Sequence, residues 1–500
     1  MAHHNGNLFR QASQHVNTPL PTGRFAALLF GGLLGGLMSC SIASAASNTM
    51  LYIADQEVDD VHELYRRDVK TSTVTKLSGA LVANGNVWQV QTDSKGKIAI
   101  YWADQDTDEV FELYKTDLKS SSVVKLNQPL VPGGSVQEDF QIDRKGNFAV
   151  YRADATTDGV YELFKADLKT SNVVKLNAPL VAGGSVQQLA LDPTGKSVVY
   201  LADQDTDEVR ELYRVDLKTG SVVKISDPLV ANGNVYYSFQ VDPKGKSVVY
   251  EADQDADEVY ELYRVDLKTG LVTKLNGPMV TDGDVDYTFQ LDSKGKSLLY
   301  RADQEIDEMY ELYRVDLKTN VISKINEPLP ADGDVTTDFL FDPKGSLVVY
   351  RADQEVENVD ELFKRDLKTS AVVKLNGPLT PEGDVRFGVR MDPKGKTVAF
   401  TADADADTVT ELYVSDLKTS SVVKLNPPLV PGGDVYTSLL QYDLTGKSLS
   451  YYGDQDEDEV DELFQVDLKT KAVIQLNEQL VTNGDVYYFL IPGGVRPLWD

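Results

Sequence analysis

Residues 235–285 read VYYSFQVDPKGKSVVYEADQDADEVYELYRVDLKTGLVTKLNGPMVTDGDV, and this stretch decides the fold. Its first part has side chains alternating at the period of a β-strand, at Val235, Tyr237, Phe239 and Val241. Three more segments of strand character follow, over residues 247–252, 261–267 and 271–275. The first turn, Asp-Pro-Lys-Gly at 242–245, has residues that a type I turn favours. The stretch therefore predicts four short strands joined by turns and loops.

The same pattern fills the rest of the chain. The Ala-Asp pair at 252–253 recurs every 49 to 51 residues, and its last copy is Gly453-Asp454. Four short strands repeated at this spacing are typical of β-propeller blades, because a blade buries its two apolar faces only against its neighbours. We predict an all-β fold, a single β-propeller of nine four-stranded antiparallel blades over residues 46–500.

The ends of the repeated region predict how the ring closes. The first repeat begins with a second strand, at residues 50–54, and the last ends with a first strand, at 486–491. We expect the C-terminal strand to complete the N-terminal blade and remove an exposed sheet edge.

The repeat also resembles a known family. DPKGKSVVYEADQDADEVYELYRVDLKTG at residues 242–270, and KLN-x-PLV-x-x-GDV after it, look like the TolB-type propeller repeat. That family's blade carries a Ser-Pro-Asp-Gly-Lys turn, an Asp-rich loop, a Leu/Ile-Tyr strand and a Leu-Thr ending. The resemblance covers residues 50–491 and departs in its Asp-Pro-Lys-Gly-Lys turns and its longer acidic loops. By analogy it implies a propeller that binds other molecules.

Residues 1–45 are typical of an export signal. An apolar run at residues 25–38 follows Arg24 and leads to small residues, with an A-x-A cleavage site at Ala43 and Ala45. A lipoprotein signal ending before Cys40, the only cysteine, is a second interpretation, and an uncleaved anchor over residues 25–46 is a third. All three place the repeats outside the cytoplasm, in the periplasm, on the cell surface or in the medium.

Charge narrows the range of partners. The chain has 78 acidic and 49 basic residues, and loss of residues 1–45, with two arginines, takes the net charge from −29 to −31. Such a protein repels nucleic acids and anionic lipids and attracts cations and basic partners. Alternate strand connections lie at opposite ends of the blades, which predicts one face rich in lysine and one rich in aspartate. We expect protein or polysaccharide partners on the acidic face, and no membrane span in the mature chain.

The loops of the acidic face are the candidate site. Alternating aspartates can direct three carboxylates toward one hard cation such as Ca²⁺. The glycine and glutamate of an EF-hand loop are missing, so a solvated acidic rim is the other interpretation. The predicted ligands are Asp104, Asp106, Asp108, Asp203, Asp205, Asp207, Asp253, Asp255, Asp257, Asp454, Asp456 and Asp458.

A second group of polar residues occupies one equivalent position on the innermost strands, at Gln91, Gln141, Gln240, Gln290 and Gln441. These glutamines either line a central channel for a polar ligand or hydrogen-bond one another and so hold the blades together. Arg386 and Arg390 break the pattern in one blade and suggest a local anion contact.

Catalytic motifs are scarce. Beyond the export segment the chain has one histidine, His62, no cysteine and no Gly-x-Ser-x-Gly elbow. Repeated near-identical blades also argue against a catalytic site, which is normally singular. We therefore expect no catalytic residues, no cofactor other than Ca²⁺, and a non-catalytic interaction protein that is not an enzyme. The alternative is a carbohydrate-active propeller enzyme, a lyase or a hydrolase.

Overall fold

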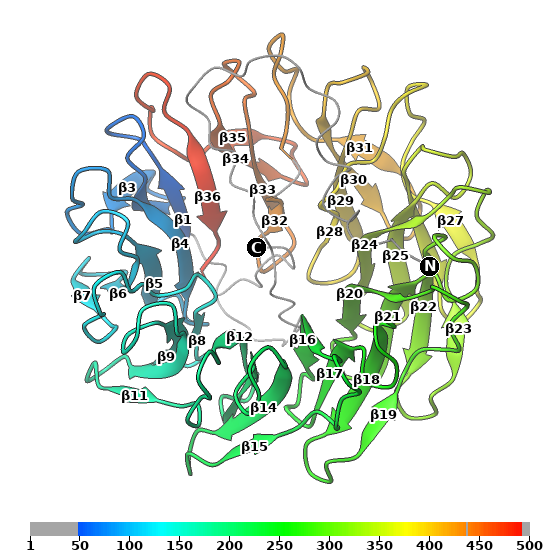
Figure 1. The fold of residues 1–500 in the computed structure, drawn as a ribbon. Coiled ribbons are helices and arrows are strands. Elements are labelled where there is room, and N and C mark those ends of the chain that lie inside the picture. The colour runs from blue at the N-terminus through cyan, green and yellow to red at the C-terminus, as the bar shows by residue number, and fades with distance from the viewer. Residues whose placement is uncertain (1–48, 437–438, 493–500) are drawn as a thin grey trace, which may run out of the picture.

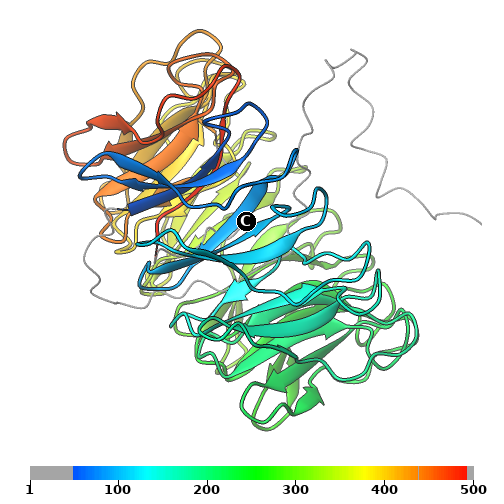
Figure 2. The same cartoon turned by 90° about the vertical axis from the view of Figure 1, so that its left-hand side faces the viewer.

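The computed structural model describes residues 49–436 and 439–492, and the export segment lies outside them. The described residues form nine four-stranded antiparallel sheets arranged in a ring (Figure 1). Figure 2 shows the ring from the side, with the sheets stacked face to face. The predicted all-β propeller with nine blades is confirmed. The described part of the chain contains no helix that could span a membrane.

Each blade has an inner, a second, a third and a fourth strand, counted outward from the ring axis. The inner strands are β36 (Val486–Leu490), β4 (Val87–Thr92), β8 (Gln141–Ile142), β12 (Val186–Leu191), β16 (Val235–Val241), β20 (Val285–Leu291), β24 (Val335–Phe341), β28 (Arg390–Met391) and β32 (Gln441–Tyr442). The second strands are β1 (Thr49–Ala54), β5 (Ile98–Ala103), β9 (Phe148–Ala153), β13 (Ser197–Ala202), β17 (Ser247–Ala252), β21 (Ser297–Ala302), β25 (Leu347–Ala352), β29 (Thr397–Ala402) and β33 (Ser448–Gly453).

The third strands all begin with the Glu-Leu pair of the repeat. They are β2 (Glu63–Asp68), β6 (Glu112–Asp117), β10 (Glu162–Asp167), β14 (Glu211–Asp216), β18 (Glu261–Asp266), β22 (Glu311–Asp316), β26 (Glu361–Asp366), β30 (Glu411–Asp416) and β34 (Glu462–Asp467). The fourth strands are β3 (Thr73–Lys76), β7 (Val123–Lys125), β11 (Val173–Lys175), β15 (Val222–Lys224), β19 (Val272–Lys274), β23 (Ile322–Lys324), β27 (Val372–Lys374), β31 (Val422–Lys424) and β35 (Val473–Gln475). We number the blades 1 to 9 in this order, so that blade 1 combines β36 with β1–β3.

The ring closes as the sequence predicts. The last strand, β36, pairs antiparallel with β1, and Leu490 lies opposite Leu51. Figure 1 shows this as the red β36 beside the blue β1. Most side chains of the closing segment are almost fully buried, including Val486, Phe489 and Ile491.

Repeated side chains pack the blades. Tyr250 on β17 and Tyr263 on β18 are both buried, and their ring centroids stack 5.7 Å apart. The equivalent pair in blade 6, Tyr300 and Tyr313, stacks at 5.4 Å. The tyrosine of each Glu-Leu-Tyr segment thus belongs to the core, which is why this residue hardly varies.

The inner-strand glutamines join neighbouring blades. Gln240 donates from Nε2 to the carbonyl of Phe289 in the next blade at 2.7 Å, and its Oε1 accepts the N–H of Leu291 at 3.1 Å. Gln91 and Gln141 contact the backbone of the next blade in the same way, and Gln290 and Gln441 each accept one N–H from the inner strand that follows. The glutamines therefore hold the blades together as expected, but these hydrogen bonds run to backbone groups and not from one glutamine to another.

Deleting residues 486–500 should prevent stable folding, because it removes β36 and its buried side chains. The deletion removes four buried apolar side chains, those of Val486, Phe489, Leu490 and Ile491. Burial of each contributes about 1.5–3 kcal/mol to the free energy of unfolding. The total stability of a folded domain is only about 5–15 kcal/mol. Size-exclusion chromatography and urea unfolding measure the result. Deletion of residues 493–500 alone leaves β36 in place and is the control. A monomeric 1–485 chain with unchanged unfolding would contradict the closure argument.

Candidate functional site

The two faces of the ring differ in their charged residues. Turns between inner and second strands contact turns between third and fourth strands, as in the bond from the Leu118 N–H to the Lys97 carbonyl (2.9 Å). These turns, which carry repeated lysines, form the lysine face. On the opposite face the loop after the second strand contacts the loop before the inner strand, as in the bond from the Val82 N–H to the Gln105 carbonyl (3.0 Å). This second face carries the aspartate loops, and we call it the acidic face.

The first aspartate of each loop holds two loops together. Asp104 is 4% exposed, and its Oδ1 accepts the N–H of Asn86 at 2.6 Å while Oδ2 accepts that of Glu109 at 3.2 Å. The equivalent backbone groups donate to Asp203, Asp253 and Asp454. These four predicted ligands act as buried hydrogen-bond acceptors for the scaffold.

The second aspartate faces the fourth strand. Lysine Nζ atoms lie 2.8–3.2 Å from the carboxylates in three pairs: Asp106 with Lys125, Asp205 with Lys224 and Asp255 with Lys274. Each lysine also pairs with the buried glutamate that opens the third strand. In blade 9 Gln475 replaces the lysine, and Asp456 accepts a hydrogen bond from Gln455 at 3.4 Å instead.

The third aspartate of each loop lies apart from the other two. Asp108 and Asp257 accept amide hydrogens from Asn84 and Asn232, both at 3.2 Å. Asp207 and Asp458 lie against glycines 183 and 432. No group of three or more His, Cys, Asp or Glu side chains among the described residues is placed to hold a metal ion. Calcium binding stays a prediction, and it would require these carboxylates to leave their present partners.

The repeats differ from one another mainly at one place, where the inner strands begin on the acidic face. Four positions converge there: the residue before the Ala-Asp pair, the residue before Glu-Leu, and the two residues after the valine that opens each inner strand. Contacts confirm that they meet, as when Trp102 stacks on Phe111 (4.2 Å) and Tyr236 meets Tyr260 edge-on (4.5 Å). We call this place the inner rim.

The inner strands are irregular at the inner rim. In blade 5 the ladder between β16 and β17 is interrupted between Val235 and Phe239, and in three blades only an isolated bridge remains there. In a regular ladder, successive side chains point to alternate faces of the sheet. Where the ladder is interrupted, the intervening residues need not follow this alternation. The fold thus allows variable side chains here while the rest of each blade stays uniform.

All the exposed aromatic side chains of the described residues lie at the inner rim. They form two pairs from adjacent blades: Tyr487 with Trp88 in blades 1 and 2, and Tyr237 with Tyr287 in blades 5 and 6. Their exposed fractions are 39%, 43%, 48% and 60%, respectively. Blades 5 and 6 lie across the ring from blades 1 and 2 (Figure 1).

The first aromatic pair surrounds the one histidine of the described residues. His62 is 8% exposed, and its ring centroid lies 3.7 Å from that of Tyr487 and 5.0 Å from that of Trp88. Burial lowers the pKa of His62 to about 4, so the imidazole is neutral at physiological pH. Its Nδ1 atom has no hydrogen-bond partner.

The second aromatic pair lies beside carboxyl groups. Glu251 on β17 is 5% exposed, and burial, followed by the charge of Asp286, raises its pKa to about 8. Asp286 forms an ion pair with Arg301, whose guanidinium lies 3.9 Å from the centroid of the Tyr310 ring. A carboxyl group whose pKa lies near neutral can take part in proton transfer, and it binds a cation once it has lost its proton.

Several arginines of the inner rim have acidic partners, whereas Arg210 contacts the rings of Tyr236 and Tyr237. Arg152 pairs with Asp139 at 2.7 Å, Arg351 pairs with Asp338 at 3.2 Å, and Arg386 pairs with Asp403 at 2.7 Å. The anion contact expected at Arg386 is thus made by an aspartate of the same blade. Arg390 lies on β28, on the inner strand itself.

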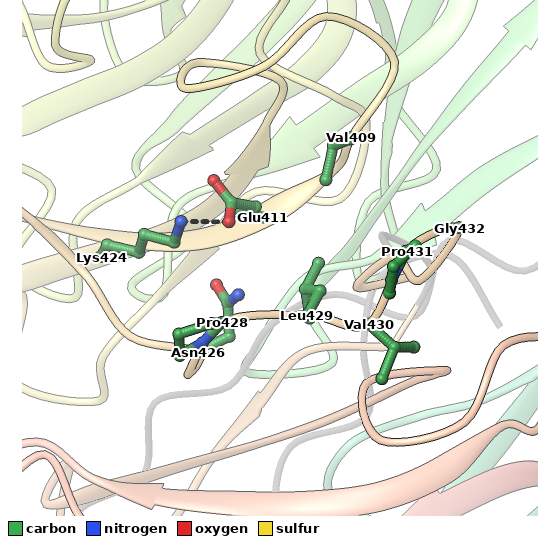
Figure 3. Close-up of a pocket in the computed structure, with 9 residues that line it drawn as sticks. All are labelled: Val409, Glu411, Lys424, Asn426, Pro428, Leu429, Val430, Pro431 and Gly432. Atoms are coloured by element: carbon green, nitrogen blue, oxygen red, sulfur yellow. Dashed lines mark ion pairs between the residues drawn. The ribbon is translucent and has the colours of Figure 1, made fainter.

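A pocket of about 600 Å³ lies on blade 8, between β30 and the loop after β31 (Figure 3). Glu411 and Lys424 form an ion pair in it, and Asn426 accepts the Leu412 N–H at 2.8 Å. Equivalent contacts occur in blade 5, where Lys274 pairs with Glu261 at 2.6 Å. The polar groups of this pocket therefore belong to the repeated scaffold and provide no chemistry special to blade 8.

Sequence reasoning missed the inner rim. The aspartate loops were predicted as the site because their residues repeat most strictly. The inner rim is instead marked by positions at which the repeats differ. The residue before Ala-Asp is Arg in blade 6 but Glu in blade 5, at Arg301 and Glu251. In a chain of near-identical copies, such a position is one that the shared core does not constrain.

Comparisons with known proteins confirm the propeller. A family model described as the dipeptidyl peptidase IV N-terminal region matches residues 155–254. Porphyromonas gingivalis dipeptidyl peptidase 4 is similar at 12% identity and a TM-score of 0.57, over 78% of this chain and 59% of that chain. The chain thus spans less than two thirds of that peptidase. No curated protein matches the sequence.

Two further solved structures are similar at lower TM-scores. An oligogalacturonate lyase in complex with manganese has 15% identity and a TM-score of 0.43, over 75% of this chain and 99% of that chain. TolB from Acinetobacter baumannii has 14% identity and a TM-score of 0.31, over 71% and 82%. The propeller part of the expected resemblance is confirmed by the fold, and membership in the TolB type stays a prediction.

The prediction that the protein is not an enzyme is wrong on these findings. The matching family model is a region of a peptidase, and the similar structure with a TM-score of 0.57 is a dipeptidyl peptidase. The prediction relied on the absence of a histidine-based triad and on the sameness of the blades. The second argument fails physically, because the inner rim differs from blade to blade and can hold a singular site.

Asp104→Ala should lower the free energy of unfolding by about 2–4 kcal/mol, because two buried N–H groups lose a charged acceptor. Asp108→Ala, in the same loop but exposed, should change it by less than about 1 kcal/mol. Urea unfolding measures both. If the loop instead bound Ca²⁺, calcium would stabilise the wild type and neither variant. Equal losses in the two variants without calcium would contradict the structural role of Asp104.

Stability should fall on acidification in a window set by His62. Its pKa is about 4 in the folded chain and about 6.5 unfolded, so the unfolded state binds the additional proton between these values. The stability is full above pH 6.5, and about 3 kcal/mol is lost as the pH falls to 4. Comparing unfolding at pH 7 and pH 4.5 should show a smaller decrease in His62→Phe than in the wild type. The same decrease in both proteins would show that His62 does not contribute.

Proposed function

We propose that the protein is a carbohydrate-active enzyme outside the cytoplasm that binds a polysaccharide across the inner rim of its acidic face. The observation that carries this is the position of the exposed aromatic residues, all of which lie at the inner rim. Exposed tyrosine and tryptophan combine a flat apolar face with a polar edge, which suits the apolar faces and hydroxyl groups of a sugar ring.

The arrangement of the aromatic residues favours a polymer. Tyr237 and Tyr287 lie on neighbouring inner strands, β16 and β20, and Trp88 and Tyr487 lie on β4 and β36 across the ring. One pair would hold a single sugar or a disaccharide, whereas a longer chain reaches both. The Tyr237 hydroxyl donates to Gln187 at 2.9 Å, which holds this ring in place before a ligand arrives.

The negative charge of the protein favours glycan hydrolysis over the lyase reaction. A lyase acting on uronic acid polymers must bind an anion, but the chain has a net charge of −29 and most of the rim arginines named above are ion-paired with aspartates. Hydrolysis of a neutral or basic glycan avoids that repulsion. The carboxyl groups of the rim can supply the acid and base that glycoside hydrolysis needs.

The location rests on the N-terminal sequence. The apolar run at residues 25–38 and the small residues after it support export, by a cleaved signal or through a lipid at Cys40. A TolB-type membership and calcium in the acidic loops accompany this proposal as predictions from the sequence.

Calorimetric titration with neutral oligosaccharides should show binding to the mature protein. Tyr287→Ala and Trp88→Ala should each weaken it about tenfold, since a lost aromatic stack corresponds to about 1.4 kcal/mol. Leu271→Ala removes a side chain that is 67% exposed away from the inner rim and should leave the affinity unchanged. Release of reducing ends measures hydrolysis. Absence of saccharide binding, or equal binding by all three variants, would refute the proposal.

A further inference from the structure

Glu251 occupies a position that other blades fill with hydrogen-bond donors. The residue before the Ala-Asp pair donates to the carbonyl of the next blade's opening valine in four blades: Trp102 to Val136, Arg152 to Val186, Arg301 to Val335 and Arg351 to Val385. In blade 4 the residue is Leu201, and Arg210 reaches the carbonyl of Val235 instead, at 3.4 Å. Blade 5 places a carboxyl group at this position.

The structure gives this carboxyl group no cation. In blades 3, 6 and 7 the same position holds a guanidinium, which is ion-paired with an aspartate of its own blade. The corresponding neighbour in blade 5 is Ser238, whose hydroxyl donates to the carbonyl of Tyr287 at 2.8 Å. The Ser238 side chain is also close enough to Glu251 to lower the pKa of that carboxyl group by hydrogen bonding. The Oε2 atom of Glu251 has no hydrogen-bond partner although the residue is only 5% exposed.

The charges that act most strongly on Glu251 are negative. Asp286 and Asp284 on the blade 6 side and Asp253 in its own blade all act on it by their charges. Arg301, the nearest cation on that side, is already bound to Asp286. A positively charged group of a ligand would therefore be attracted to this place.

We infer that Glu251 recognises an amino group on a sugar seated at the Tyr237–Tyr287 pair. The ammonium takes the place that the guanidinium occupies in blades 3, 6 and 7 and provides the partner that Oε2 lacks. The ligand class is then an amine-bearing glycan, such as a polymer of glucosamine. This inference rests on the proposed polysaccharide binding and adds the chemistry that selects the sugar.

Tyr287 lies on the exposed side from which a ligand reaches Glu251. Its ring is 60% exposed, and its hydroxyl is close enough to Glu251, Asp286 and Arg301 for their charges to act on its pKa. A sugar stacked on this ring has its substituents next to the buried carboxyl group. Tyrosine faces also attract cations, which favours an ammonium over an acetamide at the same site.

A sugar amine fits this site better than a lysine side chain. A lysine provides the charge but no ring face to cover the two exposed tyrosines. The acidic loops at the edge of the face attract any polycation, so binding by charge alone has to be separated from binding at Glu251.

The experiment compares two ligands by calorimetry at physiological salt: a β-1,4-linked glucosamine hexasaccharide and its fully N-acetylated counterpart. The wild type should bind the amine form at least about tenfold more tightly, as expected for one charge-assisted hydrogen bond. Glu251→Gln keeps the size of the side chain and should abolish this preference while leaving the affinity for the acetylated form within about twofold.

Glu261→Gln is the matched control, because it makes the same change at a buried glutamate of the same blade, where Lys274 is the partner. This variant should keep the preference for the amine form. A preference that survives in Glu251→Gln, or is lost equally in both variants, would overturn the role of Glu251. Equal wild-type affinity for the two glycans would overturn the amine inference but not glycan binding, whereas binding of neither would overturn the proposed function.

Hexalysine tests for binding by positive charge alone. It should bind weakly, lose its binding as salt rises, and show the same affinity for the wild type and Glu251→Gln. Hexalysine that competes with the glucosamine hexasaccharide at equal concentration and depends on Glu251 would identify a basic polypeptide as the ligand and overturn the saccharide assignment.

Discussion

The packing of each blade between two neighbours is the constraint on which the rest of the structure depends. A four-stranded sheet with two apolar faces has no stable state alone, so all nine blades need the ring, and the ring needs β36 to pair with β1. Stacked tyrosines such as Tyr250 and Tyr263, and glutamines such as Gln240, repeat because every blade makes the same contacts with the next. Uniform packing therefore accounts for the uniform sequence.

The same constraint explains the acidic loops. Long loops leave backbone N–H groups that need acceptors, and buried aspartates such as Asp104 accept two each. Lysines of the fourth strands neutralise the next carboxylates, as Lys274 does for Asp255 and Glu261. Much of the conspicuous acidity is thus part of the scaffold, and the remaining exposed carboxylates give the face its negative potential.

The inner rim is a place where the repeats differ in large and charged side chains. Interrupted ladders there release side chains from the shared core, and the blades use this freedom differently: His62 with Trp88 in one part of the ring, Glu251 with Tyr287 in another. A ring of similar blades can in this way hold a singular site without losing its symmetry of packing. Because binding and catalysis need asymmetry, the inner rim is where the molecule provides it.

The sequence by itself determined the fold, the blade number and the closure, because strand period, turn residues and repeat spacing are local signals that one blade shares with all others. It also placed lysines and aspartates on opposite faces, since strand connections alternate. Only the tertiary structure decided what the carboxylates do. Asp104, Asp106 and Asp108 are neighbours in sequence, yet they have three separate partners. Glu251 and Tyr287, 36 positions apart in the chain, lie close together because adjacent blades pack face to face.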